Sequence, residues 1–258
     1  MLGKVISYKR VEGKDRVEDV MPNCPQKKSF ERHMSLYLEK IRRCNTIWSI
    51  LKEMSRDMKK YIVAYNCAPA FWNATQYSLQ MCLITDIQSF LSQRKDDESL
   101  LMYFKKIKTN KNQIFTKKFY SLWRNEDTNE VHEQEHIPQY TLNQMIDICE
   151  SKLKDCLDKS KNLKMARNKI FCHITNPFLD IESCNKQILN NIKTDIIDDI
   201  LSNLSYVIMA LYGTYTNIQP ATSYANQNDC ANVFQILNIY DKYDQEIIDL
   251  IHKNIDSD

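Results

Sequence analysis

A seam of apolar positions begins at Leu142 and advances along the chain in alternating steps of four and three residues where it is unbroken. Its members are Leu142, Ile146, Cys149, Leu153, Cys156, Leu163, Ile170 and Ile174. This spacing predicts a long amphipathic helix, with Thr141 as its N-cap. Pro177 must end or bend the helix, because the residue before a proline avoids the α region. If the same spacing of three and four residues is continued, Ser160 and Arg167 occupy the two positions of the seam that have no apolar residue.

Apolar residues at helical spacing predict further helices along the chain. The expected helices run from about Ser29 to Tyr65, from Pro69 to about Leu91, onward from a cap at Asp96–Ser99, from about Ser183 to Leu211, and over Asp229–Ile239 and Asp244–Ile255. Phe115, Phe119 and Leu122 also have helical spacing, which favours an aromatic core stripe beneath solvated lysines. The polar residues 125–139 predict a loop.

Glycine content narrows the fold class, because only 3 glycines occur among 258 residues. Glycine supplies the positive-φ positions of hairpins, phosphate loops and nucleotide-binding turns, so Rossmann and P-loop folds are disfavoured. We therefore expect an all-α protein, a bundle of long amphipathic helices with short C-terminal helices. Its expected organisation is an N-terminal tail or arm over residues 1–26, a helical domain over 27–217, and an acidic helical extension over 218–258.

The cysteines and the apolar stretches of the sequence predict where in the cell the protein is located. The chain has 9 cysteines, an odd number, without C-x-x-C or other zinc-ligand spacing, which favours reduced thiols in the cytoplasm. The N-terminus lacks the apolar run of a signal peptide, and the longest apolar stretch, around Tyr206–Tyr212, is too short to span a bilayer. We expect a cytoplasmic protein with no membrane segment, no bound metal and no cofactor.

Chemically useful side chains are concentrated in the segment Arg167-Asn168-Lys169-Ile170-Phe171-Cys172-His173. A guanidinium can hold a phosphate through a planar fork of donors, and an imidazole exchanges protons near neutral pH. Arg167 belongs to the apolar seam, where a buried charge is costly unless a partner compensates it. Arg167 and His173 are about 120° apart on a regular helix, so one helix does not direct both at one phosphate. Either the arginine side chain reaches round the helix, or two copies of the motif meet across a two-fold axis.

An arginine, a polar residue, four further positions and a histidine near the end of a long helix resemble the signature of the HEPN superfamily of all-α ribonucleases. The residues Ala166–Ile174 are most similar to the abortive-infection (AbiU-type) branch, and Phe71–Asn73 resembles the start of that branch's leading core helix. The resemblance covers roughly residues 30–215. It implies a HEPN-like bundle, a homodimer across the motif helix with one cleft built from two motifs, and a possible antitoxin or regulatory protein as a further partner.

The motif residues permit RNA cleavage without a metal. A ribose 2′-OH would attack the adjacent phosphate and leave a 2′,3′-cyclic phosphate and a 5′-OH. His173 would relay the proton, Arg167 would stabilise charge on the phosphoryl oxygens, and Asn168 would orient the histidine or the phosphate. The alternative is a non-catalytic helical interaction module, in which Arg167 pairs with a buried carboxylate such as Asp86 and His173 caps a helix end.

Two other groups of residues are weaker candidates for binding. No acidic residue occurs from Ser99 to Asn125, and the lysines of this stretch are either an RNA-binding face or a solvated helix face. They are Lys105, Lys106, Lys108, Lys111, Lys117 and Lys118. His132 and His136 are four residues apart, but they belong to the polar stretch, so we interpret them as loop residues rather than a zinc site.

Overall fold

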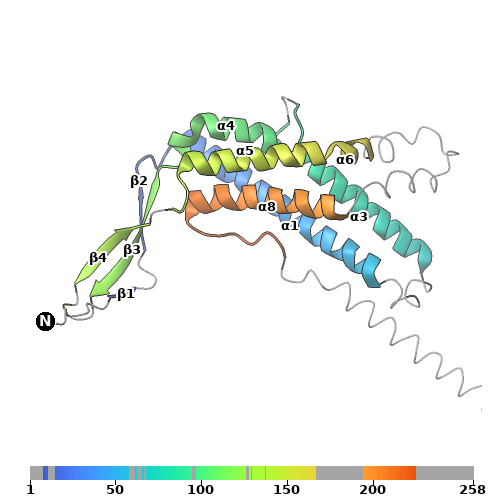
Figure 1. Ribbon diagram of the computed structural model, residues 1–258, viewed down its shortest axis with the longest axis horizontal. Helices are drawn as coiled ribbons and strands as arrows, with labels where there is room; N and C mark the ends of the chain where they lie inside the picture. Colours follow the sequence, from blue (N-terminus) through green and yellow to red (C-terminus); the bar gives the residue numbers. More distant parts are fainter. Residues whose placement is uncertain are drawn as a thin grey trace, which may run out of the picture.

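The computed structural model describes residues 8–10, 15–57, 62, 66, 68–94, 97–125, 128, 130–136, 138–166 and 194–224. Its helices are α1 (Pro25–Asp57), α3 (Pro69–Phe90), α4 (Leu100–Ile114), α5 (Leu142–Lys159), α6 (Lys161–Ala166) and α8 (Thr194–Thr216). Its strands are β1 (Tyr8–Arg10), β2 (Arg16–Asp19), β3 (Lys117–Asn125) and β4 (Val131–Glu135). The described chain is mostly helical, and its strands form a small sheet that extends from one end of the helices (Figure 1).

The helices pack around one apolar core. α8 packs against α5 and α1, and α1 also packs against α3 and α4. Side chains with almost no exposure come from all six described helices, for example Ile41 on α1, Ile87 on α3, Ile107 on α4, Leu153 on α5, Leu163 on α6 and Leu204 on α8. The prediction of a mainly helical bundle of amphipathic helices is therefore confirmed.

Side-chain caps determine where two of the helices begin. At the start of α4, Ser99 Oγ accepts a hydrogen bond from the backbone N–H of Met102 at 3.1 Å. At the start of α5, Thr141 Oγ1 accepts from the backbone N–H of Gln144 at 3.3 Å, and the Gln144 side chain accepts from the backbone N–H of Thr141 at 2.9 Å. This reciprocal pair is a capping box. Both caps agree with the sequence-based expectation.

The boundaries of α3 (Pro69–Phe90) also agree with the expected ones. α3 begins at Pro69, where a proline fits the first helical turn because that turn does not need its N–H. α1 begins at Pro25, earlier than the apolar spacing predicted. The start of the helix expected from Ser183 and the two short helices expected within 229–255 lie outside the described residues.

β3 is the central strand of the sheet, and all of its pairings are antiparallel. Tyr120 pairs with Arg16 of β2 on one side and with Glu135 of β4 on the other. Trp123 pairs with Arg10 of β1 and also with β4. β1 and β2 therefore lie end to end along one edge of β3, and β4 covers the other edge.

The sheet shows that the all-α prediction was wrong in this part of the chain. β3 occupies the stretch in which Phe119 and Leu122 have helical spacing, and β4 lies within residues 125–139, which were expected to be a loop. Pairing on both sides of β3 outweighs the weak helical preference of a few apolar residues. β4 has no alternating apolar pattern, because Val131 is its only apolar residue and its whole length is exposed.

α8 is long and apolar enough to cross a membrane, with 23 residues and a hydropathy of 1.2. It is thus longer than the apolar stretch around Tyr206–Tyr212. A core helix of a soluble protein meets the same criteria, and 44% of the apolar window in α8 is buried inside the bundle. Its acidic residue Asp198 accepts hydrogen bonds from Trp48 and Lys52 on α1. These contacts are consistent with a core helix.

Candidate functional site

The predicted catalytic residues Arg167, Asn168 and His173 lie outside the described residues, but the helix that leads to them is described as far as Ala166. The seam of this helix is buried as predicted. Exposure is at most 1% for Ile146, Cys149, Leu153, Cys156 and Leu163. The seam prediction is therefore confirmed as far as Leu163, in the helical turn before Arg167.

Ser160 divides the predicted helix into α5 and α6, but helical hydrogen bonding continues across it. The Ser160 N–H donates to the carbonyl oxygen of Cys156, and the Lys164 N–H donates to that of Ser160, each at 2.9 Å. The Ser160 oxygen also accepts from Gln88 Nε2 on α3, at 3.2 Å in a buried contact. This contact holds the start of α6 against α3 and so fixes where the seam helix lies at that end of the bundle.

The carboxylate of Asp86, the expected partner of Arg167 if the motif is only structural, is bound by another residue. Arg43 on α1 donates from Nε to Oδ2 and from Nη2 to Oδ1, both at 2.8 Å. These hydrogen bonds raise the pKa of the Arg43 guanidinium. Because each carboxylate oxygen already has a charged donor, Asp86 does not require a second arginine.

Four of the lysines in the candidate RNA-binding face are on α4. They are Lys105, Lys106, Lys108 and Lys111. The Lys108 ammonium binds Glu150 on α5 at 2.6 Å, and the Lys111 ammonium donates to Asn143 on α5. Lys105 and Lys106 are exposed and have no ion-pair partner within the described part of the chain. Half of this group therefore joins α4 to α5.

The other two lysines, Lys117 and Lys118, begin β3 and point to opposite faces of the sheet, as neighbours on a strand do. Lys117 Nζ lies 3.8 Å from the centre of the Tyr215 ring on α8. Lys118 Nζ lies 3.7 Å from a carboxylate oxygen of Glu135 on β4. The structure thus does not bring the six lysines together in one unpaired basic face.

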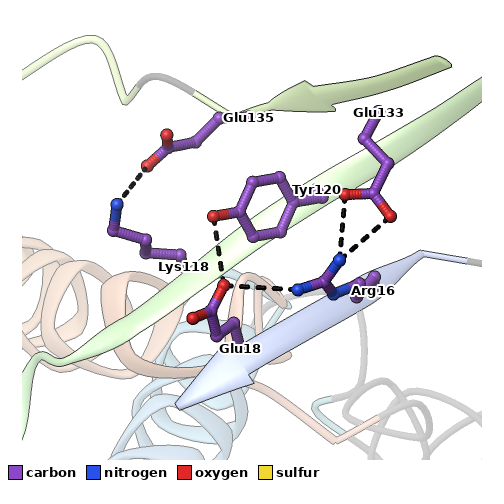
Figure 2. A network of polar contacts seen from close by, with 6 residues as sticks. All are labelled: Arg16, Glu18, Lys118, Tyr120, Glu133 and Glu135. Atoms are coloured by element: carbon purple, nitrogen blue, oxygen red, sulfur yellow. Dashed lines mark hydrogen bonds and ion pairs between the residues drawn. The ribbon is translucent and has the colours of Figure 1, made fainter. Parts of the chain in front are cut away.

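One face of the sheet carries a network of polar side chains that joins β2, β3 and β4 (Figure 2). Arg16 donates to both carboxylate oxygens of Glu133, at 3.1 and 3.2 Å, and to Glu18 at 3.4 Å. The Tyr120 hydroxyl also donates to Glu18 at 3.4 Å. The charges alternate in sign and are exposed, and each cation of the network has a carboxylate partner.

A cavity of about 560 Å³ lies where the sheet meets the helices. Its aromatic lining residues are Phe115, Phe119, Tyr140 and Tyr206, its aliphatic ones include Leu142, Met145, Met209 and Ala210, and its ionisable ones are Lys117, Lys118, Glu135 and His136. The sequence singled out the two lysines but not the cavity, because its lining comes from β3, residues 135, 136 and 138–140, α5 and α8. No local sequence pattern joins these segments.

The two histidines of the polar stretch belong to the sheet region rather than to a loop. His132 pairs with Trp123 across the ladder, and the backbone N–H of His136 donates to the carbonyl oxygen of Phe119 at 2.7 Å. No group of three His, Cys, Asp or Glu side chains that could hold a metal occurs among the residues described.

Five cysteines lie in the described part of the chain, and all are free thiols. They are Cys24, Cys44, Cys82, Cys149 and Cys156. Burial raises the pKa of the Cys149 and Cys156 thiols to about 12. Since a thiolate is the reactive form, these two seam residues act as small core side chains.

No family model, no curated protein and no solved structure matches this chain. Its function must therefore be inferred from its own residues.

Proposed function

We propose that the protein is a metal-independent endoribonuclease of the HEPN type, which cleaves RNA by attack of a ribose 2′-OH on the adjacent phosphate. The products are a 2′,3′-cyclic phosphate and a 5′-OH. His173 relays the proton, Arg167 stabilises the charge that builds on the phosphoryl oxygens, and Asn168 orients the histidine or the phosphate. In keeping with the resemblance, the proposed role is that of a cytoplasmic abortive-infection or toxin effector, with an antitoxin or regulatory protein as a possible partner.

The observation that supports this proposal most directly is the buried seam of α5 and α6. Leu163 is fully buried, and Arg167 follows it at the next seam position. A charge at such a position needs a partner, and the carboxylate of Asp86 is already held by Arg43. A phosphate group, held in a cleft that two copies of the motif form across a two-fold axis, would satisfy that requirement.

Cleavage of total cellular RNA by the purified chain and its His173→Ala variant tests the proposed roles. Loss of a general acid–base should lower the rate by roughly 10²–10⁴-fold while RNA still binds. His132→Ala, which removes an exposed histidine of β4, is the matched control and should cleave normally. Arg167→Lys should also slow cleavage, because a point charge cannot reproduce a bidentate fork.

Two further measurements test the metal-free and dimeric parts of the proposal. Cleavage should persist in EDTA, and loss of activity that magnesium restores would overturn the mechanism. Solution scattering should give a dimer at micromolar concentration, whereas a monomer would contradict a shared cleft.

The second candidate function is a non-catalytic helical module that uses the motif at a dimer or partner interface. It is favoured by the pairing of the lysines, since Lys108, Lys111 and Lys118 contact side chains of the protein itself. Normal RNA integrity with every variant, or unfolding of the protein by His173→Ala, would support this module and not the nuclease.

A further inference from the structure

The cavity between the sheet and the helices has the size of a small-ligand site. Its volume of about 560 Å³ falls within the roughly 300–1,000 Å³ typical of such sites. It is lined by the carboxyl-terminal end of α8, the first turn of α5, the start of β3, and residues 135, 136 and 138–140. A site made by several rigid elements is preformed, so a ligand does not have to order it on binding.

Aromatic rings are the most distinctive part of the lining. Phe115, Phe119, Tyr140 and Tyr206 come from four separate places in the fold. Phe115 packs edge-on against Phe30 of α1, with ring centroids 5.5 Å apart, which holds it in place. The Tyr140 side chain is 44% exposed at the opening. Rings that border an open cavity can stack on the planar face of a nucleobase, whatever its sequence.

The charge of the lining favours an anion. The lining holds two lysines and one carboxylate, and Lys118 and Glu135 are 3.7 Å apart and half-exposed. The His136 ring adds a hydrogen-bonding group to the lining. The amide side chains of Gln139, Asn217 and Gln219 also line the cavity and can bond to the edges of a base.

We propose that this cavity binds one unpaired nucleotide of an RNA strand, with the base among the aromatic rings and the phosphate near Lys118 and His136. The combination of several rings, amide groups and a small excess of positive charge matches a nucleotide better than an aliphatic or a purely acidic ligand. The inference rests on the proposed function for the identity of the ligand as RNA. It adds a recognition site that is separate from the cleavage motif.

The length of α5 contributes most of the separation between this site and Ala166, the last described residue before the motif. α5 begins at the cavity, and its 18 residues correspond to about 27 Å at the usual helical rise. α6 extends the separation further before the chain reaches Arg167. The cavity would therefore hold a nucleotide several positions away from the cleaved bond, and it should affect long RNA substrates but not a dinucleotide.

The binding test uses the full chain with His173→Ala, so that RNA stays intact, and a fluorescently labelled single-stranded 12-mer of RNA. Three variants alter the cavity in different ways: Tyr140→Ala removes a ring, Lys118→Ala removes a charge, and Ala210→Phe fills the space. Tyr140→Ala and Ala210→Phe should weaken binding by about 5- to 100-fold, the effect expected for the loss of one base–aromatic stack. Tyr224→Ala and Lys154→Ala are matched controls at exposed sites outside the cavity, and they should bind as the parent does.

Crosslinking provides a measurement that does not depend on variant folding. A 4-thiouridine 12-mer irradiated with the chain should label the peptides that contain Phe119, Tyr140 or Tyr206. Labelling confined to other segments, or unchanged affinity in both Tyr140→Ala and Ala210→Phe, would overturn the proposal. Binding of an acidic peptide to the cavity in preference to the RNA would also overturn it, since the occupant would then be a protein.

The cleavage assay separates this inference from the proposed function. In chains that keep His173, the cavity variants should raise KM for a long RNA and leave cleavage of a dinucleotide unchanged. Competition by a free nucleoside monophosphate against the 12-mer shows whether the base and phosphate alone suffice or whether the neighbouring nucleotides contribute. If the chain binds the 12-mer through the cavity but does not cleave RNA, the nucleotide-binding site is supported and the nuclease function is contradicted.

Discussion

The helical bundle and the sheet of this protein have different sources of stability. Buried apolar side chains fill the bundle, and in α8 they recur along the whole helix. In the sheet, by contrast, every side chain of β4 and most of β2 are exposed, and one face is held by ion pairs between exposed groups. The sheet is therefore held by its backbone ladder and by its attachment to the bundle, because the described side chains of its strands form no apolar core.

Asp19, at the end of β2, contributes to this attachment. Its carboxylate binds the buried ammonium of Lys27 on α1 and accepts a hydrogen bond from Thr116 Oγ1 at 2.7 Å, just before β3. It also accepts from the backbone N–H of Met21 at 3.1 Å. One side chain thus connects the edge strand, the first helix and the central strand.

Truncation of the core of α8 should have the largest effect. Leu204 is fully buried, so Leu204→Ala should lower the free energy of unfolding by about 2–5 kcal/mol. Val17 of β2 is 54% exposed, and Val17→Ala should change the free energy of unfolding by less than about 0.5 kcal/mol. Urea unfolding followed by far-UV circular dichroism measures both. Equal effects of the two substitutions would show that the sheet has a core of its own.

The second-largest decrease in the free energy of unfolding is expected from Arg43→Ala. This substitution leaves the carboxylate of Asp86, which is 8% exposed, without its two charged donors, and should cost roughly 1–3 kcal/mol in the same unfolding experiment. Arg32 is the matched control, because it lies on the same helix but pairs with Glu98 at the exposed surface; Arg32→Ala should cost about 0–1 kcal/mol. The double variant Arg43→Ala/Asp86→Ala should recover part of the loss, and a further additive loss would contradict this account.

Acid should loosen the attachment of the sheet. Burial tends to raise the pKa of Asp19, but hydrogen bonds from Lys27, Thr116 and Met21 outweigh it and lower the pKa to about 2. Because this pKa is below the unfolded value of 3.8, the contribution is present above about pH 4 and is lost as the pH falls towards 2. The difference in urea midpoint between the wild type and Asp19→Asn should therefore shrink over that range. A constant difference from pH 7 to pH 2 would show that the Asp19 carboxylate is not involved.

The smallest decrease in the free energy of unfolding is expected from Arg16→Ala, which removes a residue of the network in Figure 2. Arg16 is 53% exposed, and its pairs with Glu18 and Glu133 are at the surface, so the cost should be below about 1 kcal/mol. The cost should fall further in 1 M salt, where the screening length is about 3 Å. An effect on unfolding that is larger than that of Arg43→Ala, or that salt does not change, would contradict the assignment of these pairs to the surface.

The helices could be predicted because their signals are local. The seam from Leu142, the cap residues Ser99 and Thr141 and the proline at position 69 each act within one or two helical turns, and the structure agrees with all of them. The burial of Ser160 together with the apolar seam also agrees, since its side chain bonds within its own helix to the carbonyl oxygen of Leu157.

The strands could not be predicted because the groups that determine them are distant in sequence or exposed. β3 is defined by partners about 100 residues earlier in the chain, such as Arg16 opposite Tyr120. β4 reads Val-His-Glu-Gln-Glu, and its exposed charges carry no alternating pattern although they suit an edge strand. The cavity was missed for the same reason, since Tyr140 and Tyr206 meet only through the fold.

The separation of β2 and β3 along the chain also has a consequence for the order of folding. Closing a loop of about 100 residues is slow and entropically costly, whereas the β3–β4 hairpin and the α4–β3–β4–α5 segment involve neighbours in sequence. During synthesis, residues 16–19 are made long before their partner strand and have nothing to pair with until α1, α3 and α4 have followed. We expect β2 to join last, and pulsed hydrogen exchange during refolding should protect the amides at the β2–β3 ladder after those of α5 and α8.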